Sequence, residues 1–317
     1  MPLDHYISQV YLRKFLAPDL ENRMHAMRKS DLSTFAPRTR DVCRTPDGNT
    51  NRHLQESRAI EAFLEDVEPR FNAAYDRFAE GEPRQEDIYS LAGLLSYFLT
   101  CSPGAMRINA EPLRAHVEAA ARVMDEQGAF DDAPETLGGG TLTDILDDGR
   151  VGITVDPQYP AAIGTAGIFG RVSLFGNGHW DVLINQHERC GFFTSDYPIA
   201  IEDTPDPQVL ARILPLSPTV AVRITPDSAR RRADPDFNFP GFRYVRSEIS
   251  AAEARRINQL LVRSAEDLVF AADWDPWRPQ FVERHRHYRI ETVTNTVPVP
   301  GGEMLHFRAE ILPFQRC

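Results

Sequence analysis

Lysine is almost absent from this sequence. Two of its 35 basic residues are lysines, at positions 14 and 29, and all the others are arginines. Arginine is the better residue for bidentate contacts with carboxylate or phosphate groups, although a high-GC codon usage would produce the same preference. The basic residues are outnumbered by 46 acidic ones, which gives a formal net charge of -11. The electrostatic field of a negatively charged protein does not attract nucleic acid, so binding of nucleic acid would need a local basic groove.

Cysteines and long apolar runs are also scarce. The four cysteines (Cys43, Cys101, Cys190 and Cys317) lie far apart in the sequence, which excludes a metal knuckle or a redox pair motif. No run of about 18 apolar residues exists, so no membrane-spanning helix is expected. The first residues intersperse charges and lack an apolar core, unlike a signal peptide. We therefore expect a cytoplasmic protein with reduced thiols and no membrane association.

Several familiar motifs are missing. The sequence has no phosphate-binding loop, no dinucleotide fingerprint, no Gly-x-Ser-x-Gly elbow and no His-Glu-x-x-His. We therefore expect no cofactor. His285 and His287 would lie on one side of a predicted strand, but no third ligand has diagnostic spacing. A metal-dependent enzyme built on these two histidines is the last of three alternatives, and no metal is predicted.

The order of predicted elements favours an α+β fold. The 317 residues are 42% hydrophobic, enough for a sizeable core. Helical periodicity dominates the first half, and strand patterns dominate the second. We predict a helical N-terminal half packed on a mostly antiparallel sheet with one late helix. The predicted helices are 51–80 (interrupted at Pro69), 85–99, 105–127, 141–148 and 250–271, and the predicted strands are 22–29, 170–175, 179–186, 191–194, 212–216, 219–224, 288–299 and 304–311.

The glycine run at 138–140 is a weak boundary between two parts. Residues 1–135 form the mainly helical half, and residues 141–317 form the half with the sheet. We expect the two halves to make one interlocked globular unit.

The first stretch that could carry chemistry is residues 5–15, HYISQVYLRKF. If these residues form a helix, His5, Gln9, and Leu12 or Arg13 follow one another one turn apart along one face. A single histidine on a helix is more often a core or surface residue than a catalyst, and glutamine alone indicates nothing. The combination on consecutive turns is what makes this stretch a candidate site.

The second stretch is FFTSDYP, residues 192–198. Two aromatic residues end a predicted strand, and the polar residues after them turn the chain. Scaffolds often hold site residues at such positions. Asp196 could act as a general base or a ligand, or could accept hydrogen bonds from the backbone of a bend.

These stretches resemble a known family. Residues 5–15 are similar to the signature His-His-Tyr-Val-Pro-Gln-x-Tyr-Leu-(Arg/Lys)-x-Phe of the bacterial family known as domain of unknown function four-two-three-eight. Residues 60–61 resemble its Ile-Glu, residues 193–198 its Phe-Ile-Thr-Ser-Asp-Asn-Pro, residues 214–218 its Pro-Leu-Ser-Pro, and Asn258 its late helical asparagine. The resemblance covers residues 4 to 275. It implies site positions but no reaction, because the family has no established activity.

The chain departs from that signature at three positions. Asp4 stands where the first histidine belongs, Ser8 where the proline belongs, and Tyr197 where the second motif has asparagine. If the histidine doublet supplied two ligands, this chain lacks one of them.

Our leading hypothesis is a hydrolase-like enzyme. His5, Glu61 and Asp196 would be its catalytic residues, and Gln9, Arg13 and Ser195 would bind the substrate, because two acids and an imidazole suit the activation of water. The arginine-rich composition suggests a nucleic acid or another phosphate compound, and the family analogy suggests a nuclease or phosphodiesterase of bacterial conflict systems.

The alternative is a non-catalytic binding or interaction module in which His5 and Asp196 form a structural pair. Such a pair would anchor the N-terminal segment to the sheet. Truncating either residue of a catalytic pair would cost less than about 1 kcal/mol in stability, whereas truncating a buried structural pair would cost more. The sequence does not indicate an oligomeric state.

Overall fold

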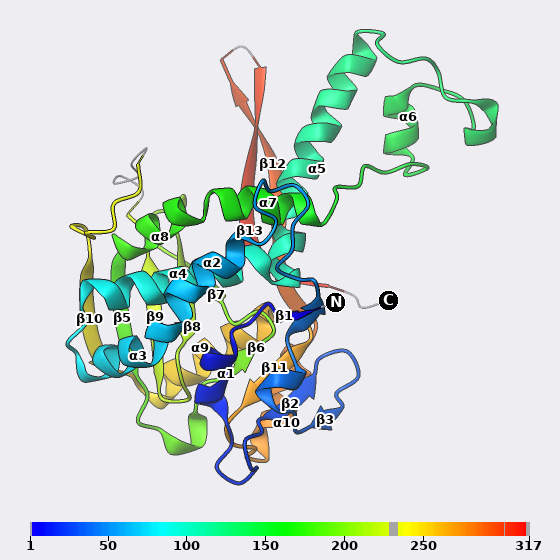
Figure 1. Ribbon diagram of the computed structural model, residues 1–317. Coiled ribbons are helices and arrows are strands. Elements are labelled where there is room, and N and C mark those ends of the chain that lie inside the picture. Colours follow the sequence, from blue (N-terminus) through cyan, green and yellow to red (C-terminus); the bar gives the residue numbers. More distant parts are fainter. Residues whose placement is uncertain (1, 228–233, 301, 315–317) are drawn as a thin grey trace.

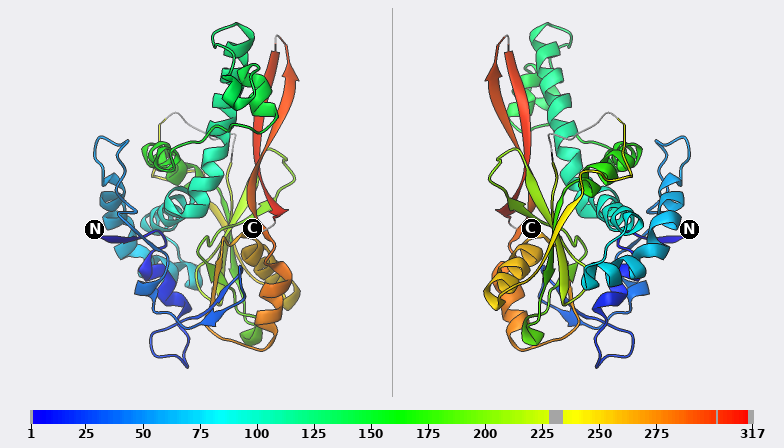
Figure 2. Two further views of the ribbon diagram at one scale, coloured as in Figure 1. Left: turned by 90° about the vertical axis from the view of Figure 1, so that its right-hand side faces the viewer. Right: turned by 90° about the vertical axis from the view of Figure 1, so that its left-hand side faces the viewer.

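The protein is built around a five-stranded sheet that lies between two groups of helices (Figures 1 and 2). The structure is a computed structural model that describes residues 2–227, 234–300 and 302–314. The helices are α1 (Gln9–Leu12), α2 (Ala59–Val67), α3 (Phe71–Glu80), α4 (Gln85–Cys101), α5 (Pro103–Glu126), α6 (Leu142–Asp147), α7 (Gln158–Ala166), α8 (Ile168–Gly176), α9 (Ala251–Ser264) and α10 (Trp277–His285). The 3-10 turns are η1 (Arg13–Phe15), η2 (Thr39–Asp41), η3 (Glu68–Arg70), η4 (Glu135–Leu137) and η5 (Glu188–Cys190).

The strands form four sheets. They are β1 (Leu3–His5), β2 (His25–Arg28), β3 (Thr34–Phe35), β4 (Arg44–Pro46), β5 (His179–Ile184), β6 (Thr194–Ser195), β7 (Ala200–Asp203), β8 (Leu210–Pro215), β9 (Val220–Thr225), β10 (Arg243–Glu248), β11 (Leu268–Ala271), β12 (Tyr288–Val299) and β13 (Gly302–Pro313). The main sheet has the order β10-β5-β9-β8-β7, antiparallel except for the parallel β10–β5 pair. This arrangement confirms the predicted α+β class.

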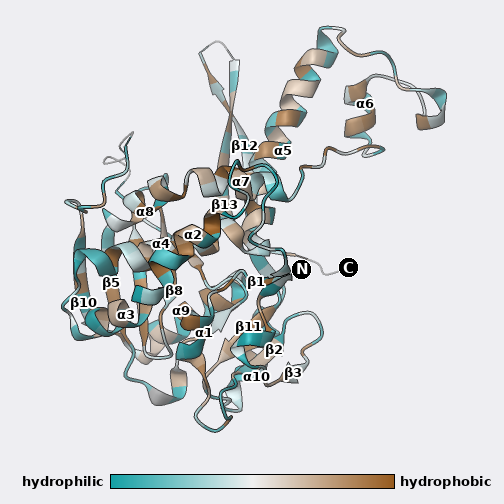
Figure 3. Cartoon of the chain, viewed as in Figure 1, coloured by the Kyte–Doolittle hydropathy of each residue, from teal (hydrophilic) through white to brown (hydrophobic). Residues whose placement is uncertain are grey.

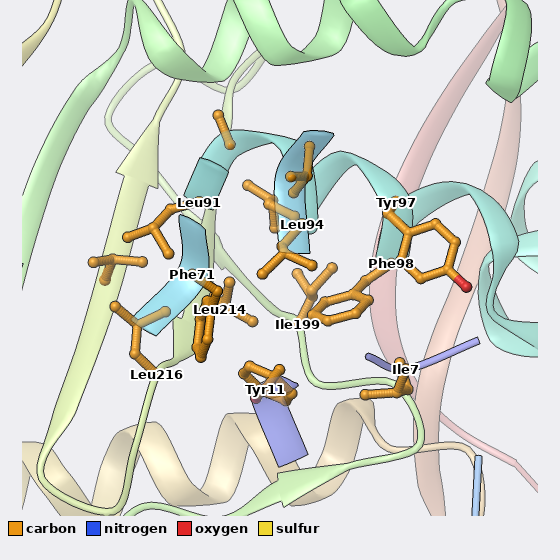
Figure 4. Packing of buried hydrophobic residues seen from close by; sticks show 14 of the residues in the cluster. Ile7, Tyr11, Phe71, Leu91, Leu94, Tyr97, Phe98, Ile199, Leu214 and Leu216 are labelled. Carbon is orange, nitrogen blue, oxygen red and sulfur yellow. The ribbon is translucent and has the colours of Figure 1, made fainter. Parts of the chain in front are cut away.

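Apolar side chains on both faces of its strands explain why the main sheet is covered on both faces. On β9, Val222 and Ile224 belong to the large core that includes α4, whereas Ala221 belongs to a second cluster with α9. Successive side chains of a strand point to opposite faces, so β9 serves both cores. Figure 4 shows the larger core, in which Tyr11 of α1 lies near the apolar side chains of α4.

A second sheet joins the two halves of the sequence. Its order is β3-β2-β11-β6, so β2 and β3 from the first 35 residues share a sheet with two strands of the second half, and β2 pairs directly with β11. Lys29, directly after β2, is fully buried and donates hydrogen bonds to Ala265 O and Tyr288 O. Side chains and strands from both predicted halves are therefore packed together.

The helical half follows the predicted pattern closely. The long amphipathic segment begins at Ala59, later than the predicted start at residue 51, but it changes to a 3-10 turn at Pro69 and ends before Gly81 as predicted. Gly81 has a φ of 89°, the left-handed conformation that glycine adopts most easily at a helix end. The next helix, α4, is buried on most of its surface, as its apolar sequence predicts.

Several predictions of local structure are wrong. Residues 170–175, predicted as a strand, lie in α8, where Ile168, Val172 and Phe175 are buried at helical spacing; short apolar runs do not distinguish strand from helix. The predicted helix 250–271 begins as expected, with Ser250 Oγ accepting from Glu253 N at 3.2 Å, but it ends at Ser264, and β11 follows. An additional late helix, α10, contains His285, which was predicted on a strand.

Two long elements project from the body (Figures 1 and 2). One is the outer half of α5 together with α6, and the other is the β12–β13 hairpin, confirmed in the predicted place. None of the described helices is long and apolar enough to cross a membrane.

Candidate functional site

The N-terminal motif folds as a strand end and one helical turn, and not as the predicted continuous helix. His5 closes β1 opposite Arg44, and α1 begins only at Gln9. Ser8, between them, has φ -54° and ψ 132°. A proline adopts these angles as well, which explains how Ser8 can stand where the family signature has proline. His5 Nδ1 nevertheless lies 3.5 Å from Gln9 Nε2, so the two polar side chains meet as predicted.

The other side of this motif is buried. Tyr11 is fully buried and its hydroxyl lies 2.7 Å from Thr194 Oγ1 of β6. Its ring packs at 5.2 Å from Phe98 and 6.0 Å from Phe71, measured between centroids (Figure 4). The two sequence motifs therefore do meet, through Tyr11 and Thr194.

His5 and Gln9 line a pocket of about 460 Å³. Glu61 of α2 lines the same pocket, so three of the six predicted site residues are brought together. The complete lining is Leu3, Asp4, His5, Gln9, Asn49, Glu61, Leu64, Glu65, Glu68 and Pro69. Four of these ten residues are acidic, which gives the pocket a negative character.

Asn49 is the residue that connects the walls of this pocket. Its Nδ2 donates to Glu61 Oε1, and its Oδ1 accepts from Tyr97 Oη at 3.2 Å. The same Tyr97 hydroxyl contacts the carbonyl oxygen of His5. Tyr97 comes from the buried helix α4, so a rigid element fixes both the loop that carries Asn49 and the strand end that carries His5.

Asp4, which also lines the pocket, is held by an ion pair. Arg58 donates to both carboxylate oxygens, at 3.1 and 3.2 Å, and the backbone N–H of Asn49 donates at 3.1 Å. Burial raises the pKa of Asp4, but these hydrogen bonds outweigh it, so the pKa is lowered and the carboxylate stays ionised. Arg58 also lies 3.3 Å from Glu61. The position where the family signature has a histidine thus carries an ion pair in this chain.

The imidazole of His5 favours its neutral form. Burial lowers its pKa, and the charge of Arg44 acts in the same direction, while the backbone of Arg40 and Thr39 opposes the shift. The Nε2 atom is buried and has no hydrogen-bond partner among the described residues. A buried ring nitrogen without a partner carries a desolvation cost, which is common for groups retained for function.

Glu68 is the second acid with a distinctive environment. Burial raises the pKa of its carboxyl group, and the nearby charge of Glu61 raises it further. The Ser8 hydroxyl and the Arg13 guanidinium oppose the shift. Glu61 and Glu68 are seven residues apart, which places them on the same side of the α2–η3 segment, two turns apart. The pocket therefore holds two carboxyl groups in different environments.

The remaining predicted site residues lie outside the lining of this pocket. Arg13 is exposed at the start of η1, near Glu68. The Ser195 hydroxyl, almost fully buried, accepts a hydrogen bond from the backbone N–H of Tyr197 at 3.2 Å. That contact is a local turn interaction.

Asp196 binds backbone and not His5. Its carboxylate accepts N–H donors from Glu266, Asp267 and Leu268 at 3.0, 2.8 and 2.9 Å. Among the described residues no hydrogen bond links Asp196 to His5, whose ring contacts Gln9. Asp196 holds the bend that leads into β11, the backbone role weighed as an alternative from the sequence.

A site built on His285 and His287 receives no support. His285 is on α10, and its Nδ1 accepts a hydrogen bond from Arg263 Nε at 3.3 Å. Among the described residues, no three His, Cys, Asp or Glu side chains gather in a way that could hold a metal ion.

Sequence reasoning missed Asn49, Glu68 and Tyr97. Glu68 had a usable signal, because it follows Glu61 by two helical turns. Asn49 lies in a loop, and the tyrosine lies on an apolar helix. Their roles depend on how distant segments meet, for which the sequence has no local pattern.

The fold and the site define an α+β protein with an acidic, polar pocket between its N-terminal strand and its first long helix. The chain belongs to the family described as "Protein of unknown function (DUF4238)", whose model matches residues 4–275. This match confirms the resemblance seen in the sequence motifs. No curated protein and no solved structure matches the chain.

Proposed function

We propose that this protein is a hydrolase-like enzyme and that the pocket around His5, Glu61 and Glu68 is its active site. The observation that carries the proposal is the pair of carboxyl groups in unequal environments. Glu68 is the acid whose pKa is raised by burial, and Glu61 is held by Asn49 and Arg58. Such pairs allow one group to give a proton while the other accepts one.

Each residue then has a definite task. Glu68, whose pKa is raised by burial, gives a proton to the leaving group. Glu61, oriented by Asn49, takes a proton from the attacking water. Neutral His5 and the amide of Gln9 hydrogen-bond the substrate, because both residues line the pocket. Arg13 stands beside Glu68 and tunes its charge.

The charge of the pocket limits the class of substrate. Asp4, Glu61 and Glu65 bring three acidic side chains to the pocket. One nearby cation, Arg58, pairs with both Asp4 and Glu61, and the histidine of the pocket favours its neutral form. A phosphodiester would be repelled by this lining. A neutral or positively charged substrate fits better, so the nuclease expected from the arginine-rich composition is the less favoured form of the hypothesis. The buried, unpaired Cys43, Cys101 and Cys190 suit a reducing compartment such as the cytoplasm.

A panel of small chromogenic substrates tests the proposal. 4-Nitrophenyl acetate is the neutral probe, arginine 4-nitroanilide the cationic probe and bis(4-nitrophenyl) phosphate the anionic one. We expect turnover of a neutral or cationic probe, reduced at least 100-fold in kcat/KM by Glu61→Gln and by Glu68→Gln. Glu80→Gln, an exposed change on α3, is the matched control and should leave turnover unchanged.

The same panel separates the enzyme from the alternative module. Binding of the arginine probe without turnover, weakened by the same two variants, would identify a non-catalytic pocket for cationic ligands. Turnover that survives both variants would reject the assigned roles. Thermal melts of all three variants distinguish loss of chemistry from loss of folding.

A further inference from the structure

The projecting arm, residues 111–150, differs in charge from the rest of the molecule. It contains ten acidic residues and three arginines, and no lysine. It therefore carries a formal charge of -7 out of the -11 of the whole chain, in 40 of the 317 residues. This concentration of charge lies on an element that stands away from the body (Figures 1 and 2).

The arginines of the arm are already engaged within it. Arg114 pairs with Glu111 and Glu118, Arg122 with Glu118 and Asp147, and Arg150 with Asp148. Four acids around the tip form no ion pair or side-chain hydrogen bond with described residues. They are Glu126, Asp131, Asp132 and Glu135, and all four are exposed. The excess negative charge of the tip is thus open to solvent.

The arm has an internal packing side. Asp125 Oδ2 accepts the backbone N–H of Thr143 at 2.8 Å, and Arg122 lies 2.8 Å from Asp147, so α5 and α6 are tied together. Ile145 of α6 is buried, with 5% of its surface exposed. The arm is therefore an ordered helical element with one covered face and one open face.

The open face of the arm is apolar. On α5, Val117, Ala120, Val123 and Met124 span an arc of about 120° at 100° per residue. Val117 and Val123 are each 52% exposed and Met124 is 45% exposed. Phe130 (41%) and Leu137 (43%), in the connection between α5 and α6, are exposed as well, and Figure 3 shows the hydrophobic segments along the arm. Single exposed apolar residues need no explanation, but a contiguous stripe marks an interaction surface.

The hairpin covers only the inner end of this stripe. His116 packs against Phe307 of β13 with ring centroids 5.0 Å apart. Farther out, Val297 and Met304 are a cross-strand pair and both are exposed, so they share one face of the hairpin. Met304 and Phe307 are three residues apart on β13, so their side chains point to opposite faces of the hairpin. Met304 and its partner Val297 on β12 are therefore turned away from α5. The outer part of the α5 stripe therefore remains uncovered.

We propose that the open face of the arm is a docking site for a positively charged amphipathic helix of a partner protein. An apolar stripe on one helix packs against the apolar face of another, and lysines or arginines beside that face would meet the four free acids of the tip. The charge argues against other occupants. A second copy would bring the same acidic arm, and nucleic acid or an anionic membrane would be repelled.

Model peptides test this site with the full-length protein. The probe is a fluorescent 14-residue leucine–lysine peptide that forms an amphipathic helix, compared with a scrambled peptide of the same composition. We expect the amphipathic peptide to bind at least 10-fold more tightly than the scrambled one, measured by fluorescence anisotropy. Val123→Ser with Met124→Ser should weaken binding at least 10-fold, and so should Asp131→Asn with Asp132→Asn.

Matched controls separate this site from general attraction to an acidic protein. Val245→Ser removes an equally exposed valine (51%) from β10, and Glu21→Gln with Glu82→Gln removes two exposed charges from the body. Both controls should leave binding unchanged. Equal binding to the arm and control variants overturns the proposal, and so does the absence of peptide binding at millimolar concentration. Dimers in analytical ultracentrifugation that are lost in the Val123 and Met124 variant would also overturn it, since the occupant would then be a second copy.

Discussion

The hydroxyl groups of Tyr11 and Thr194 lie 2.7 Å apart across 183 residues of sequence, in a fully buried environment. This contact joins the N-terminal motif to the Thr-Ser-Asp motif, and either hydroxyl can be the donor. It places the buried side of the first motif against β6, and leaves His5 and Gln9 free to line the pocket on the other side. The two motifs are therefore linked by packing, while only the first contributes to the candidate site.

A double-mutant cycle tests this link. We expect Tyr11→Phe and Thr194→Val each to lower the free energy of unfolding by about 1–3 kcal/mol, because each leaves the other hydroxyl buried and unpaired. The double variant should lose less than the sum, with a coupling above about 0.5 kcal/mol, in denaturant melts. Additive losses would show that the hydroxyl contact contributes nothing beyond the packing of the two side chains.

Asp196 should behave as a structural residue. Asp196→Ala removes the acceptor of three backbone N–H groups. We therefore expect the free energy of unfolding to fall by more than about 2 kcal/mol. If Asp196 were catalytic, as hypothesised from the sequence, Asp196→Ala would lower the free energy of unfolding by less than about 1 kcal/mol. Denaturant melts of this variant beside His5→Ala decide between them. Since no hydrogen bond joins the two side chains, the effects of the two changes should add.

Asp196 also gives a pH dependence of stability. Burial, strengthened by the charge of Glu266, raises the pKa of Asp196 from 3.8 to about 6 against the opposing backbone hydrogen bonds. Between these values the folded protein holds a proton that the unfolded chain has lost. The contribution to stability therefore falls as the pH rises from about 4 to about 6. Asp196→Asn should abolish this component, as measured by urea melts at several pH values.

His285 should produce the opposite slope. Burial, followed by the charges of Arg263 and Arg284, lowers the pKa of His285 from 6.5 to about 4. In this window the unfolded chain binds the extra proton, so stability rises with pH from about 4 to about 6.5. We expect His285→Gln to remove the part of the stability that rises with pH. The part that falls with pH, which comes from Asp196, should remain. NMR titration of the His285 ring checks the pKa directly, and a value near 6.5 would contradict the assignment.

Some elements of the fold could be predicted from the sequence and others could not, and the difference has physical reasons. The segment from Ala59 to Glu80 was predictable, with its break at Pro69 and its end at Gly81, because proline and glycine act locally. The segment 168–176 was not, because a short apolar run fits either a strand or a helix until its tertiary neighbours are known. The closing hairpin was found because two strand patterns flank a glycine pair.

The candidate site shows the same division. His5, Gln9 and Glu61 were identified from the sequence, and the pocket brings them together. Ser195 and Asp196 belong to an equally distinctive sequence motif, but their side chains bind backbone groups. Ser195 binds the local turn, and Asp196 binds residues 266–268. A polar residue within a specific motif can serve folding as well as chemistry. Only the identity of its hydrogen-bond partners distinguishes the two.

The two lysines of the chain should contribute very differently to the stability of the fold. Lys29 is fully buried, and its ammonium group donates to Arg263 O, Ala265 O and Tyr288 O, two of which are carbonyls at the C-terminal end of α9. Its positive charge also complements the negative end of that helix dipole. Lys29→Met keeps the volume and leaves these carbonyls without their donor, so we expect a loss of about 2–4 kcal/mol.

Lys14 is the matched control. Its ammonium group lies 3.9 Å from the centre of the Tyr75 ring and 4.0 Å from Asp76, at a partly exposed position. Exposed ion pairs and cation–π contacts contribute about 1 kcal/mol or less, so Lys14→Met should cost no more than that. Urea melts of both variants provide the comparison. Equal, small losses would mean that water replaces Lys29 at the carbonyls, and the ammonium group would then not be needed to hold β2 against α9.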